Sequence, residues 1–397
     1  MSSNGRHCLS KIFQPIINVS KTANLSHRDV TSKSQRLMLE LGIIHQAIPG
    51  CFHFLPLGIK SLNKLVRIVD EEMSKIGGQK IRRSRPDLFH LKDRHSHDYI
   101  LSPTHEEVAS DLIARLAPLS YKNFPLRLYQ MSNKYRDEMK PRFGLMRGRE
   151  FLMKDMYSFD VDAESAMKTY EEVCQSYDNV FKRVGIDFVK VLVCRNCDYS
   201  ANVELSGSNK CPNCEEQEKI DVQTGIEVGH TFLLGSKYSE PLKARFLAKN
   251  GKPEVLQMGS YGIGLSRTIA ASVEVLSSEQ EMGWPDSLAP YNVIILPPKS
   301  GSKEESTMKG VAEKLYSDLE AQIPSLKDNV LLDDRVSLTI GRRQVDARRV
   351  GYRYMIVINQ KAAEHPPLFE LYDAKENIRV YLSQNELFRY IKDYTMF

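Results

Sequence analysis

Two strand-like runs around a basic loop constrain the fold of this chain more than any other feature. The stretch "YRDEMKPRFGLMRGREFLMKD", residues 135–155, holds six Arg or Lys residues with acidic residues between them. Pro141 stiffens the loop, whereas Gly144 and Gly148 loosen it. The flanking residues within 125–159 have the pattern of strands. We therefore expect an antiparallel strand–loop–strand unit that grips an anionic ligand accompanied by a metal or an amine.

Side-chain alternation in this unit predicts a nucleotide site. An antiparallel pair would bring Arg136, Glu138 and Phe151 onto one surface. An Arg offers a planar fork to phosphate oxygens, and an aromatic ring offers a platform on which a base can stack. The chain has neither GxxxxGK[ST] nor GxGxxG, so this would be an ATP site without a P-loop. A salt-bridged surface hairpin is the alternative that the spacing leaves open.

A second candidate is the glycine-rich turn "GSYGIGLSR", residues 259–267. Gly262 and Gly264 would let the backbone approach ATP closely, and the helix that follows would offer its N-terminus to phosphate. Arg267 lies near the start of that helix and could reach a terminal phosphate. The alternative is an ordinary strand–helix turn, which also needs glycine.

A third candidate is "SPTHEE", residues 102–107. Thr104 and Glu106 would place a hydroxyl and a carboxylate at a helix start, where they could hold a small ammonium group. The alternative is a capping box in which Thr104 caps the helix and Glu107 completes the motif.

Length and pattern indicate at least two domains. The 397 residues are 42% hydrophobic and 26% charged, as in globular proteins, and no apolar run is long enough to span a bilayer, which predicts no membrane association. We expect helices over 31–76, broken by the turn "IPGCFHFLPLG". Beyond a boundary at 286–290, strands alternate with helices, including one over 303–321, which predicts an α/β domain with a largely parallel sheet. The net charge of +5 permits an RNA partner.

The N-terminal residues 1–30 have the composition of an organelle transit segment. The first 28 residues carry four Arg or Lys residues, several serines and no acid. This pattern predicts import into the mitochondrial matrix. A disordered basic tail is the alternative.

Two CxxC pairs predict a structural zinc site in a polar link over 192–224. They are Cys194, Cys197, Cys211 and Cys214, with 13 residues between the pairs. Four thiolates at this spacing can close a tetrahedral zinc site. Buried free thiols, left from a shortened insertion, are the alternative.

These stretches together resemble prolyl-tRNA synthetases of the bacterial and mitochondrial type, which are class II aminoacyl-tRNA synthetases. "YRDEMKPRFGLMRGREF" resembles motif 2 of the class, and "MGSYGIGLSR" resembles motif 3. "SPTHEE", "GIEVGHTFLLGSKYSE" and "LLDDR" extend the resemblance over most of 31–397. It implies an α+β class II catalytic domain over 31–286, with an antiparallel sheet flanked by helices. An α/β anticodon-binding domain would follow over 287–397.

The resemblance also implies roles on the ATP side of the site. Arg136 would bind the α-phosphate and the amino-acid carboxylate, and Glu138 would contact the adenosine end. Arg147 would hold the distal phosphates, Phe151 would stack on adenine, and Arg267 would cover the γ-phosphate. Arg136, Glu138 and Arg267 would thus be the catalytic residues, with Mg²⁺ as the accompanying ion.

On the amino-acid side, Thr104 and Glu106 would receive the prolyl imino group, with Arg136 at the carboxylate. Glu227 and His230 would line the same pocket. The partners implied are proline, tRNA(Pro) and a second copy of the chain. The implied anticodon contacts are Asp334, Arg335 and Arg343.

The chain departs from the family pattern in three places. After "GGQKI" much of motif 1, which builds the dimer interface, is missing; after "DFVKV" a Ser-His-Glu-Phe stretch that closes over proline is missing. Only a short link lies between Glu204 and Gly225, where many bacterial members carry an editing insertion. We therefore expect ATP binding, weak proline activation, a weakened dimer and no clearance of mischarged alanyl-tRNA in cis.

Two rival interpretations remain from the sequence. One is a catalytically impaired relative that binds tRNA or has a regulatory role, which the missing proline-closing stretch favours. The other is a zinc-ribbon nucleic-acid module, which accounts only for residues 194–214. The presence of Arg136, Glu138, Phe151 and Arg267 favours the enzyme.

Overall fold

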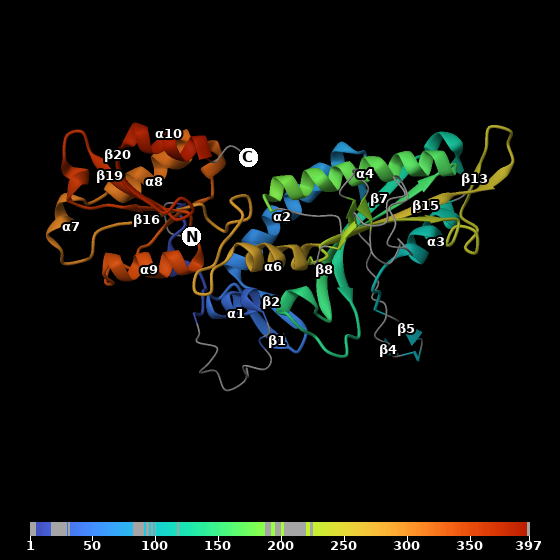
Figure 1. Ribbon diagram of the computed structural model, residues 1–397, viewed down its shortest axis with the longest axis horizontal. Helices are drawn as coiled ribbons and strands as arrows, with labels where there is room; N and C mark the ends of the chain where they lie inside the picture. Colours follow the sequence, from blue (N-terminus) through green and yellow to red (C-terminus); the bar gives the residue numbers. More distant parts are fainter. Residues whose placement is uncertain are drawn as a thin grey trace.

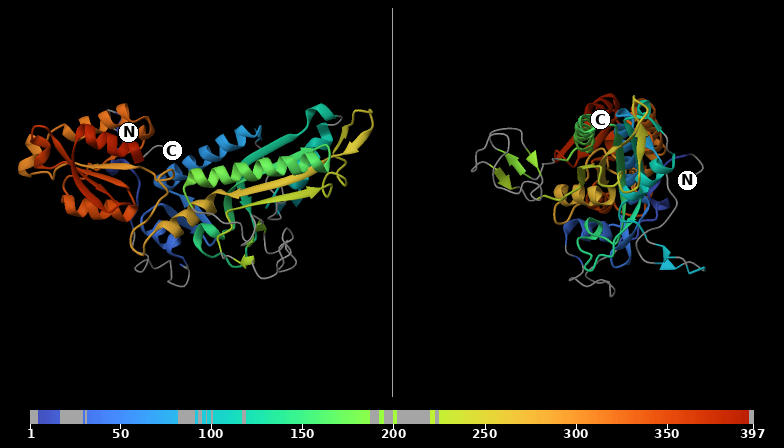
Figure 2. Two further views of the ribbon diagram at one scale, coloured as in Figure 1. Left: turned by 45° about the horizontal axis from the view of Figure 1, so that its top comes forward. Right: turned by 90° about the vertical axis from the view of Figure 1, so that its right-hand side faces the viewer.

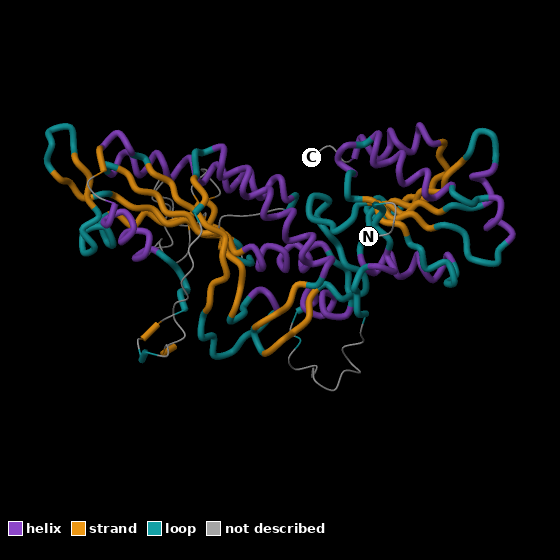
Figure 3. The backbone as a smooth tube through the Cα atoms, turned by 180° about the vertical axis from the view of Figure 1, so that it is seen from behind, coloured by secondary structure: helices purple, strands orange, loops and turns teal. Residues whose placement is uncertain are grey.

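The chain folds into two lobes, each built around a five-stranded sheet (Figure 1). The computed structural model describes residues 5–16, 30, 32–81, 91–92, 95–96, 98–99, 101–116, 119–186, 192–194, 200–201, 220–222 and 225–394. Seen from behind, the strands of the two sheets form two separate groups along the long axis, with helices packed beside them (Figure 3). Within these described stretches no helix combines the length and the apolar character needed to cross a membrane.

The larger lobe contains a sheet with the strand order β12-β15-β8-β7-β3. Its strands are β3 (Gln79–Lys80), β7 (Leu126–Tyr135), β8 (Glu150–Asp160), β12 (Gly229–Gly235) and β15 (Gln257–Gly264). All neighbours are antiparallel except β3, which pairs in parallel with β7. The antiparallel sheet expected for the catalytic domain is therefore confirmed.

The strand–loop–strand unit predicted around residues 135–155 is the β7–β8 pair. Lys134 lies opposite Phe151, and Tyr135 lies opposite Glu150. The N–H of Arg136 then donates to the carbonyl of Arg149 at 2.9 Å, which closes the base of the loop. This register places alternate residues of both strands on one face, as the sequence predicted.

Helices cover one face of this sheet. They are α1 (Lys33–Glu40), α2 (Pro56–Lys75), α4 (Ala163–Val184) and α6 (Leu265–Leu276). α2 starts with Pro56 in its first turn, and α4 begins at the cap Asp162 and ends at Gly185, which has a φ of 80°. Figure 2 shows α2 and α4 running side by side over the sheet. The hydrophobic core between these helices and the sheet continues into the smaller lobe, where it includes Ile294 and Met355.

The other face of the sheet is covered only in part, at the end where α3 (Glu106–Leu116) packs. Ala109 and Ile113 of α3 pack with Tyr157 and Phe159 of β8 in a second core. Beyond α3, this face carries the side chains of the candidate site. Three further strands are paired at this end of the lobe: β6 (Leu119–Ser120), β13 (Arg245–Leu247) and β14 (Pro253–Val255).

The turn predicted inside residues 31–76 is in fact a β-hairpin. Strands β1 (Ile44–Ile48) and β2 (Cys51–Phe54) pair antiparallel. The carbonyl of Gly50 at its tip accepts hydrogen bonds from the N–H groups of Arg149 (2.7 Å) and Glu150 (3.3 Å). The hairpin therefore supports the start of β8 and the basic loop from behind.

The smaller lobe has the strand order β17-β16-β18-β19-β20. Its strands are β16 (Val293–Leu296), β17 (Val330–Leu332), β18 (Tyr354–Val357), β19 (Leu368–Asp373) and β20 (Ile378–Ser383). β17, β16 and β18 are parallel, whereas β19 and β20 are antiparallel additions. The predicted parallel sheet is thus present at one side and extended by an antiparallel pair.

Helices lie on both faces of this second sheet, α8 and α10 on one and α9 on the other (Figure 1). The bounds are α7 (Lys303–Thr307), α8 (Val311–Gln322), α9 (Ile340–Val350) and α10 (Gln384–Tyr394). The single helix predicted over 303–321 is wrong, because Gly310 takes a φ of 80° and separates α7 from α8. A left-handed residue cannot continue a right-handed helix.

Two small sheets complete the described secondary structure. β4 (Leu91–Lys92) and β5 (Asp98–Tyr99) pair antiparallel. β9 (Leu192–Cys194), β10 (Ser200–Ala201) and β11 (Ile220–Val222) form a three-stranded sheet where the sequence predicted a loop-like link.

Residues 5–16 connect the two lobes, although they fall within the predicted transit segment. His7 accepts a hydrogen bond from Leu332 N at its carbonyl (2.9 Å). Leu9 is buried, and the Gln14 amide donates to the Leu41 carbonyl at 2.8 Å. This segment therefore belongs to the packed structure and contacts both lobes.

Candidate active site

Arg136 and Phe151 lie together at the end of the β7–β8 pair. The Arg136 guanidinium carbon lies 5.1 Å from the centre of the Phe151 ring. Their proximity follows from the register, because Lys134 pairs with Phe151 and Arg136 comes two residues further along. A cation beside an aromatic face can hold a phosphate while the ring stacks on a base.

Glu138 and Arg147 face each other across the basic loop. Arg147 Nε lies 2.9 Å from Glu138 Oε2. This hydrogen bond lowers the pKa of the Glu138 carboxyl and raises that of the Arg147 guanidinium. Arg149 Nε also donates to the carbonyl of Glu138 at 3.0 Å. The pair is exposed to solvent, so Arg147 can exchange this partner for an anion.

Arg267 projects from the first turn of α6 to the same region. Its Nε donates to the carbonyl of Met146 at 2.8 Å, and an Nη donates to the carbonyl of Glu227 at 2.9 Å. Burial lowers the pKa of Arg267; the Glu227 carboxylate raises it, while the charges of Arg136 and Arg147 lower it further. Three guanidinium groups thus repel one another here, and a bound polyanion would relieve that repulsion.

His230 and Glu227 lie beside Arg267. His230 Nδ1 is 3.7 Å from Glu227 Oε1, and this interaction lowers the pKa of Glu227. The His230 imidazole lies over Gly262 of β15. A Cβ at position 262 would stand 2.6 Å from His230 Cε1 and 2.3 Å from Met153 Cε, so only glycine fits there. Gly262 thus packs against these side chains, and its approach to ATP stays a prediction.

Thr104 and Glu106 also lie on this face, and the capping box predicted for Thr104 and Glu107 is wrong. α3 begins at Glu106, and the Thr104 hydroxyl donates to Glu106 Oε2 at 2.5 Å. Ser260 Oγ of β15 donates to Glu106 Oε1 at 2.9 Å. Together they form a polar cluster of two hydroxyls and one carboxylate, which suits an ammonium group.

Sequence reasoning missed Ser260 and a buried polar network next to this polar cluster. Ser260 lies two residues from Gly262, so β-strand alternation puts both on one face and could have identified it. The network joins His105, Lys134 and Asp155, all buried. Its members come from separate parts of the chain, and no local pattern connects them.

The predicted zinc site lies largely outside the described residues. Cys194 is the last residue of β9, while Cys197, Cys211 and Cys214 are not among the residues described. Across the described residues, no group of three or more His, Cys, Asp or Glu side chains could hold a metal ion. Zinc binding thus stays a prediction.

In the smaller lobe, the three predicted anticodon residues follow β17 or lie on α9. Arg343 is fully buried, and its Nη groups donate to the carbonyls of Asp333 (3.1 Å) and Pro297 (2.6 Å). Arg335 is paired with Asp333 at 2.8 Å. Asp334 accepts the Ser10 hydroxyl at 2.5 Å. Arg343 thus acts on the backbone of these loops and has no exposed surface for a direct contact.

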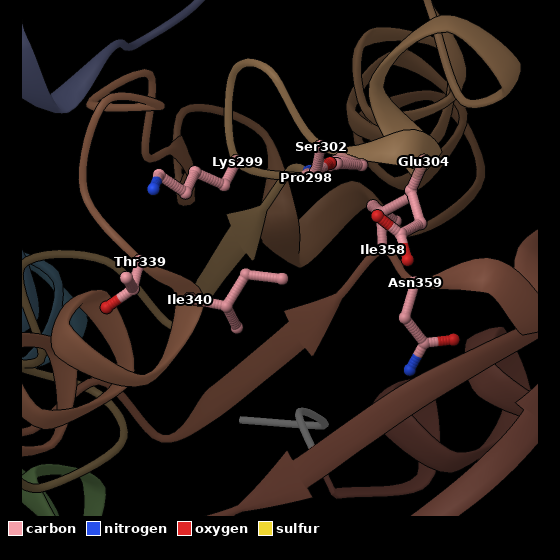
Figure 4. A pocket seen from close by; sticks show the side chains of 8 residues that line it. All are labelled: Pro298, Lys299, Ser302, Glu304, Thr339, Ile340, Ile358 and Asn359. Carbon is pink, nitrogen blue, oxygen red and sulfur yellow. The ribbon is translucent and has the colours of Figure 1, made fainter.

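A hollow of about 190 Å³ lies in the same lobe, after the ends of β16 and β18 (Figure 4). In an open α/β sheet, ligands bind at the carboxyl ends of parallel strands. Figure 4 shows Lys299 and Thr339 on one side of this hollow and Glu304 and Asn359 on the other. The lining residues are Pro298, Lys299, Ser302, Glu304, Thr339, Ile340, Ile358 and Asn359.

Comparison with known proteins first gives the class. Residues 89–276 match the family model described as tRNA synthetase class II core domain (G, H, P, S and T). The antiparallel sheet and the arginine-lined site fit this match, and they define a class II aminoacyl-tRNA synthetase.

The fold is also that of two solved prolyl-tRNA synthetases. That of Giardia lamblia, in complex with prolyl-adenylate, has a TM-score of 0.75 at 17% identity and covers 90% of this chain and 75% of that chain. That of Cryptosporidium parvum, complexed with halofuginone and AMPPNP, has a TM-score of 0.73 at 15% identity and covers 91% and 76%.

Curated relatives then give the family. A probable mitochondrial proline–tRNA ligase of Rattus norvegicus is 42% identical and covers 96% of this chain and 89% of its own length. The corresponding protein of Homo sapiens is 42% identical over 92% and 87%, and that of Schizosaccharomyces pombe 36% over 85% and 88%. The chain belongs to the proline–tRNA ligase family. The rat alignment extends over 427 positions, more than the 397 residues of this chain, so the relative holds segments that this chain lacks.

Proposed function

We propose that this chain is a mitochondrial proline–tRNA ligase, which activates proline with ATP and transfers it to tRNA(Pro). The observation that carries the proposal is that two groups of side chains lie on one sheet face. Arg136 and Arg147 act electrostatically on Arg267, and Arg136 lies beside the Phe151 ring. The polar cluster around Glu106 lies on the same face. One site suits a nucleotide polyanion and the other suits an amine.

Each residue of the nucleotide side has a distinct task. Phe151 would stack on adenine, with Glu138 at the adenosine end. Arg136 would bind the α-phosphate and the proline carboxylate together, and thereby bring the reacting groups within contact distance. Arg147 would leave Glu138 to hold the distal phosphates, and Arg267, fixed by two backbone carbonyls, would cover the γ-phosphate.

On the amino-acid side, the secondary ammonium of proline would lie against Glu106 and Thr104. Ser260 donates to one carboxylate oxygen of Glu106 and Thr104 to the other, which fixes the carboxylate plane. His230 and Glu227 would close the pocket toward the phosphates. Charge-assisted hydrogen bonds of this kind are stronger than neutral ones and set the orientation of the substrate.

The reaction needs no nucleophile from the protein. The proline carboxylate attacks the α-phosphate in line, and pyrophosphate leaves. Arg136 and Arg267 stabilise charge as it develops on the phosphate oxygens. Mg²⁺, when bound, would neutralise the phosphates further. ATP-bound Mg²⁺ is usually coordinated by one or two carboxylates and the phosphates, a demand that Glu227 beside Arg267 fits.

Residues 287–397 would bind the anticodon loop of tRNA(Pro). Asp334 and Arg335 lie after the end of β17, near the same edge of the sheet as the hollow beside Lys299 and Thr339. Single-stranded loops are recognised by pockets that receive splayed bases. Arg343 would contribute by holding the loops that carry these residues.

We also propose a localisation and an assembly for this ligase. We place the protein in the mitochondrial matrix, as a homodimer weakened by the incomplete motif 1, with structural zinc at the four paired cysteines. The transit segment predicted over residues 1–30 stays a prediction. Its cleavage after residue 16 would remove the contacts that residues 5–16 make with both lobes.

One observation favours a second candidate function, a tRNA-binding relative with impaired catalysis. The alignment with the rat protein contains positions that this chain lacks. Aminoacylation of mitochondrial tRNA(Pro) by the purified chain separates the two. Formation of prolyl-tRNA supports the ligase, whereas tRNA binding without ATP-dependent charging supports the impaired relative.

A further inference from the structure

A buried ion network lies beneath the substrate loop, which we define as residues 104–106. Lys134 Nζ lies 2.9 Å from Asp155 Oδ1, 3.0 Å from His105 Nδ1 and 2.7 Å from Ser132 Oγ. Its N–H groups hydrogen-bond to His105 Nδ1 and Ser132 Oγ, and its charge pairs with the Asp155 carboxylate. The Lys134 side chain has no exposed surface, so it acts on the loop and not on a ligand directly.

His105 connects this network to the substrate loop through its backbone and its ring. Its N–H donates to the Tyr157 hydroxyl at 2.8 Å, and that hydroxyl donates to Asp155 Oδ2 at 2.8 Å. The ring Nδ1 is approached by Lys134 Nζ and, at 2.9 Å, by Gln130 Nε2. Because an ammonium can only donate, the Lys134 contact places Nδ1 as the acceptor. His105 is therefore held at two points on β7 and β8.

The residues on either side of His105 are those that we assign to proline. Thr104 precedes it and Glu106 follows it, and their side chains are joined at 2.5 Å. From the sheet, Ser260 Oγ donates a hydrogen bond to Glu106 Oε1 (2.9 Å). The position of the Glu106 carboxylate thus depends on how firmly the residue beside it is held.

The charges of the network make it sensitive to the loss of one member. Burial lowers the pKa of Lys134, whereas the carboxylates of Asp155 and Glu106 raise it. Removing one partner of a buried ion pair leaves an uncompensated charge, but removing both does not. Comparing the loss of Lys134 alone with the loss of both partners therefore separates the effect on charge balance from the effect on the geometry of the substrate loop.

We propose that Lys134, Asp155 and His105 form a positioning network that fixes the substrate loop for the ammonium group of proline. The inference rests on the proposed function, because it assigns Thr104 and Glu106 to proline. Lys134 and Asp155 touch no substrate, and they act through His105. The ATP side of the site is built on other residues, so its affinity is independent of the network.

The chain offers a matched control in Lys154. It lies next to Asp155 in β8, has no exposed surface and points to the other face of the sheet. Its Nζ contacts the Tyr177 hydroxyl (2.5 Å) and the Tyr261 carbonyl (3.1 Å). Lys154→Met thus removes an equally buried ammonium from the same strand pair without touching the substrate loop.

The test compares Lys134→Met, the double variant Lys134→Met/Asp155→Asn and Lys154→Met with the unmodified chain. KM for proline and for ATP are measured by ATP–pyrophosphate exchange, and thermal stability is measured alongside. We expect Lys134→Met to raise KM for proline roughly 10- to 100-fold, with KM for ATP within about twofold. The double variant should regain stability yet keep the high KM for proline, and Lys154→Met should leave both KM values unchanged.

The proposal is overturned if the double variant regains both the thermal stability and the KM for proline of the unmodified chain. The pair would then serve charge balance alone. An equal rise in KM for proline and ATP would also overturn it. Should the unmodified chain show no proline-dependent exchange, the proposed function fails, and hydrogen–deuterium exchange then tests the network by itself. Faster amide exchange over 104–107 in the double variant than in Lys154→Met supports the network, and equal exchange contradicts it.

Discussion

Arg267 and Met146 are 121 residues apart in sequence, yet Arg267 Nε donates to the Met146 carbonyl at 2.8 Å. This bond joins the first turn of α6 to the short 3₁₀ turn Gly144–Met146 inside the basic loop. The loop that holds Arg147 and the helix that holds Arg267 are therefore fixed relative to each other. The arginine cluster is thus positioned before any phosphate binds, which is the arrangement that preorganised electrostatic catalysis requires.

Arg136→Ala should slow proline activation strongly. The variant loses the donor that we assign to the α-phosphate as charge develops there, and we expect a loss of about 2–4 kcal/mol in kcat/KM for exchange. Arg142→Ala, which removes an exposed arginine of the same loop, is the control and should lose little. A folded Arg136→Ala protein with unchanged exchange would show that Arg136 has no role at the α-phosphate.

Gly262→Ala should displace His230 and weaken proline binding. The added Cβ would stand 2.6 Å from His230 Cε1, so the imidazole has to move away from the pocket. We expect KM for proline to rise about tenfold or more, as for other displacements near 1 Å. Gly341→Ala has no heavy atom within 4 Å of its Cβ and serves as control. Equal KM values in the two variants would remove His230 from the proline site.

Stability should rise with pH above neutrality because of Lys154. Burial lowers its pKa from the ordinary value of 10.5 to about 7 in the folded protein. Between these values the unfolded chain binds more protons than the folded one, so the free energy of unfolding increases with pH, by up to about 1.4 kcal/mol per pH unit from this group. Lys154→Met should flatten that rise. Denaturant unfolding between pH 7 and 9 tests this, and parallel curves for both proteins would contradict it.

Removal of residues 1–16 should destabilise the junction between the lobes. The deletion exposes the pocket of Leu9 and removes the bonds of Ser10 to Asp334 and of His7 to Leu332. Burial of one leucine contributes about 1.5–3 kcal/mol, so a fall in Tm of several degrees is expected. Leu9→Ala in the full chain should show part of the same loss. If Tm stays constant in both proteins, the segment is not part of the stable fold.

Restoring the two missing family stretches, after "GGQKI" and after "DFVKV", should raise proline activation while ATP affinity stays constant. A lid that surrounds the proline ring excludes water, whereas without it a small apolar ring gains little, because one methylene is worth only ~1–3 kcal/mol even in a good pocket. The stretches can be taken from the rat relative, which is 42% identical. Equal kcat/KM for proline before and after insertion would show that the gaps are tolerated.

The parts of the fold that the sequence predicts best are those in which a strand or helix periodicity extends over many residues. The β7–β8 pair and α6 follow from alternation and helical spacing, and the Arg136–Phe151 contact follows from strand pairing. The β1–β2 hairpin was missed because its strands are short. The break at Gly310 was missed because one glycine inside a helical pattern is often tolerated.

In the candidate site, too, the sequence predicts what depends on local pattern and not what depends on contacts between distant segments. Motif residues were identified individually, but Ser260 and the network of His105, Lys134 and Asp155 depend on contacts between distant segments. The capping box was wrong because Thr and Glu near a helix start fit both a cap and a ligand pocket. Composition likewise did not predict the packing of residues 5–16, because it describes only charge and polarity.

Proline-dependent ATP–pyrophosphate exchange by the purified chain is the most direct test of the central claim, that this site activates proline. It is measured with each of the twenty amino acids in turn, with alanine as the near-sized competitor. We expect exchange that depends on proline, exceeds that with every other amino acid, and falls with Arg136→Ala. Exchange that proline does not stimulate at any concentration, or that another amino acid stimulates more, would contradict it.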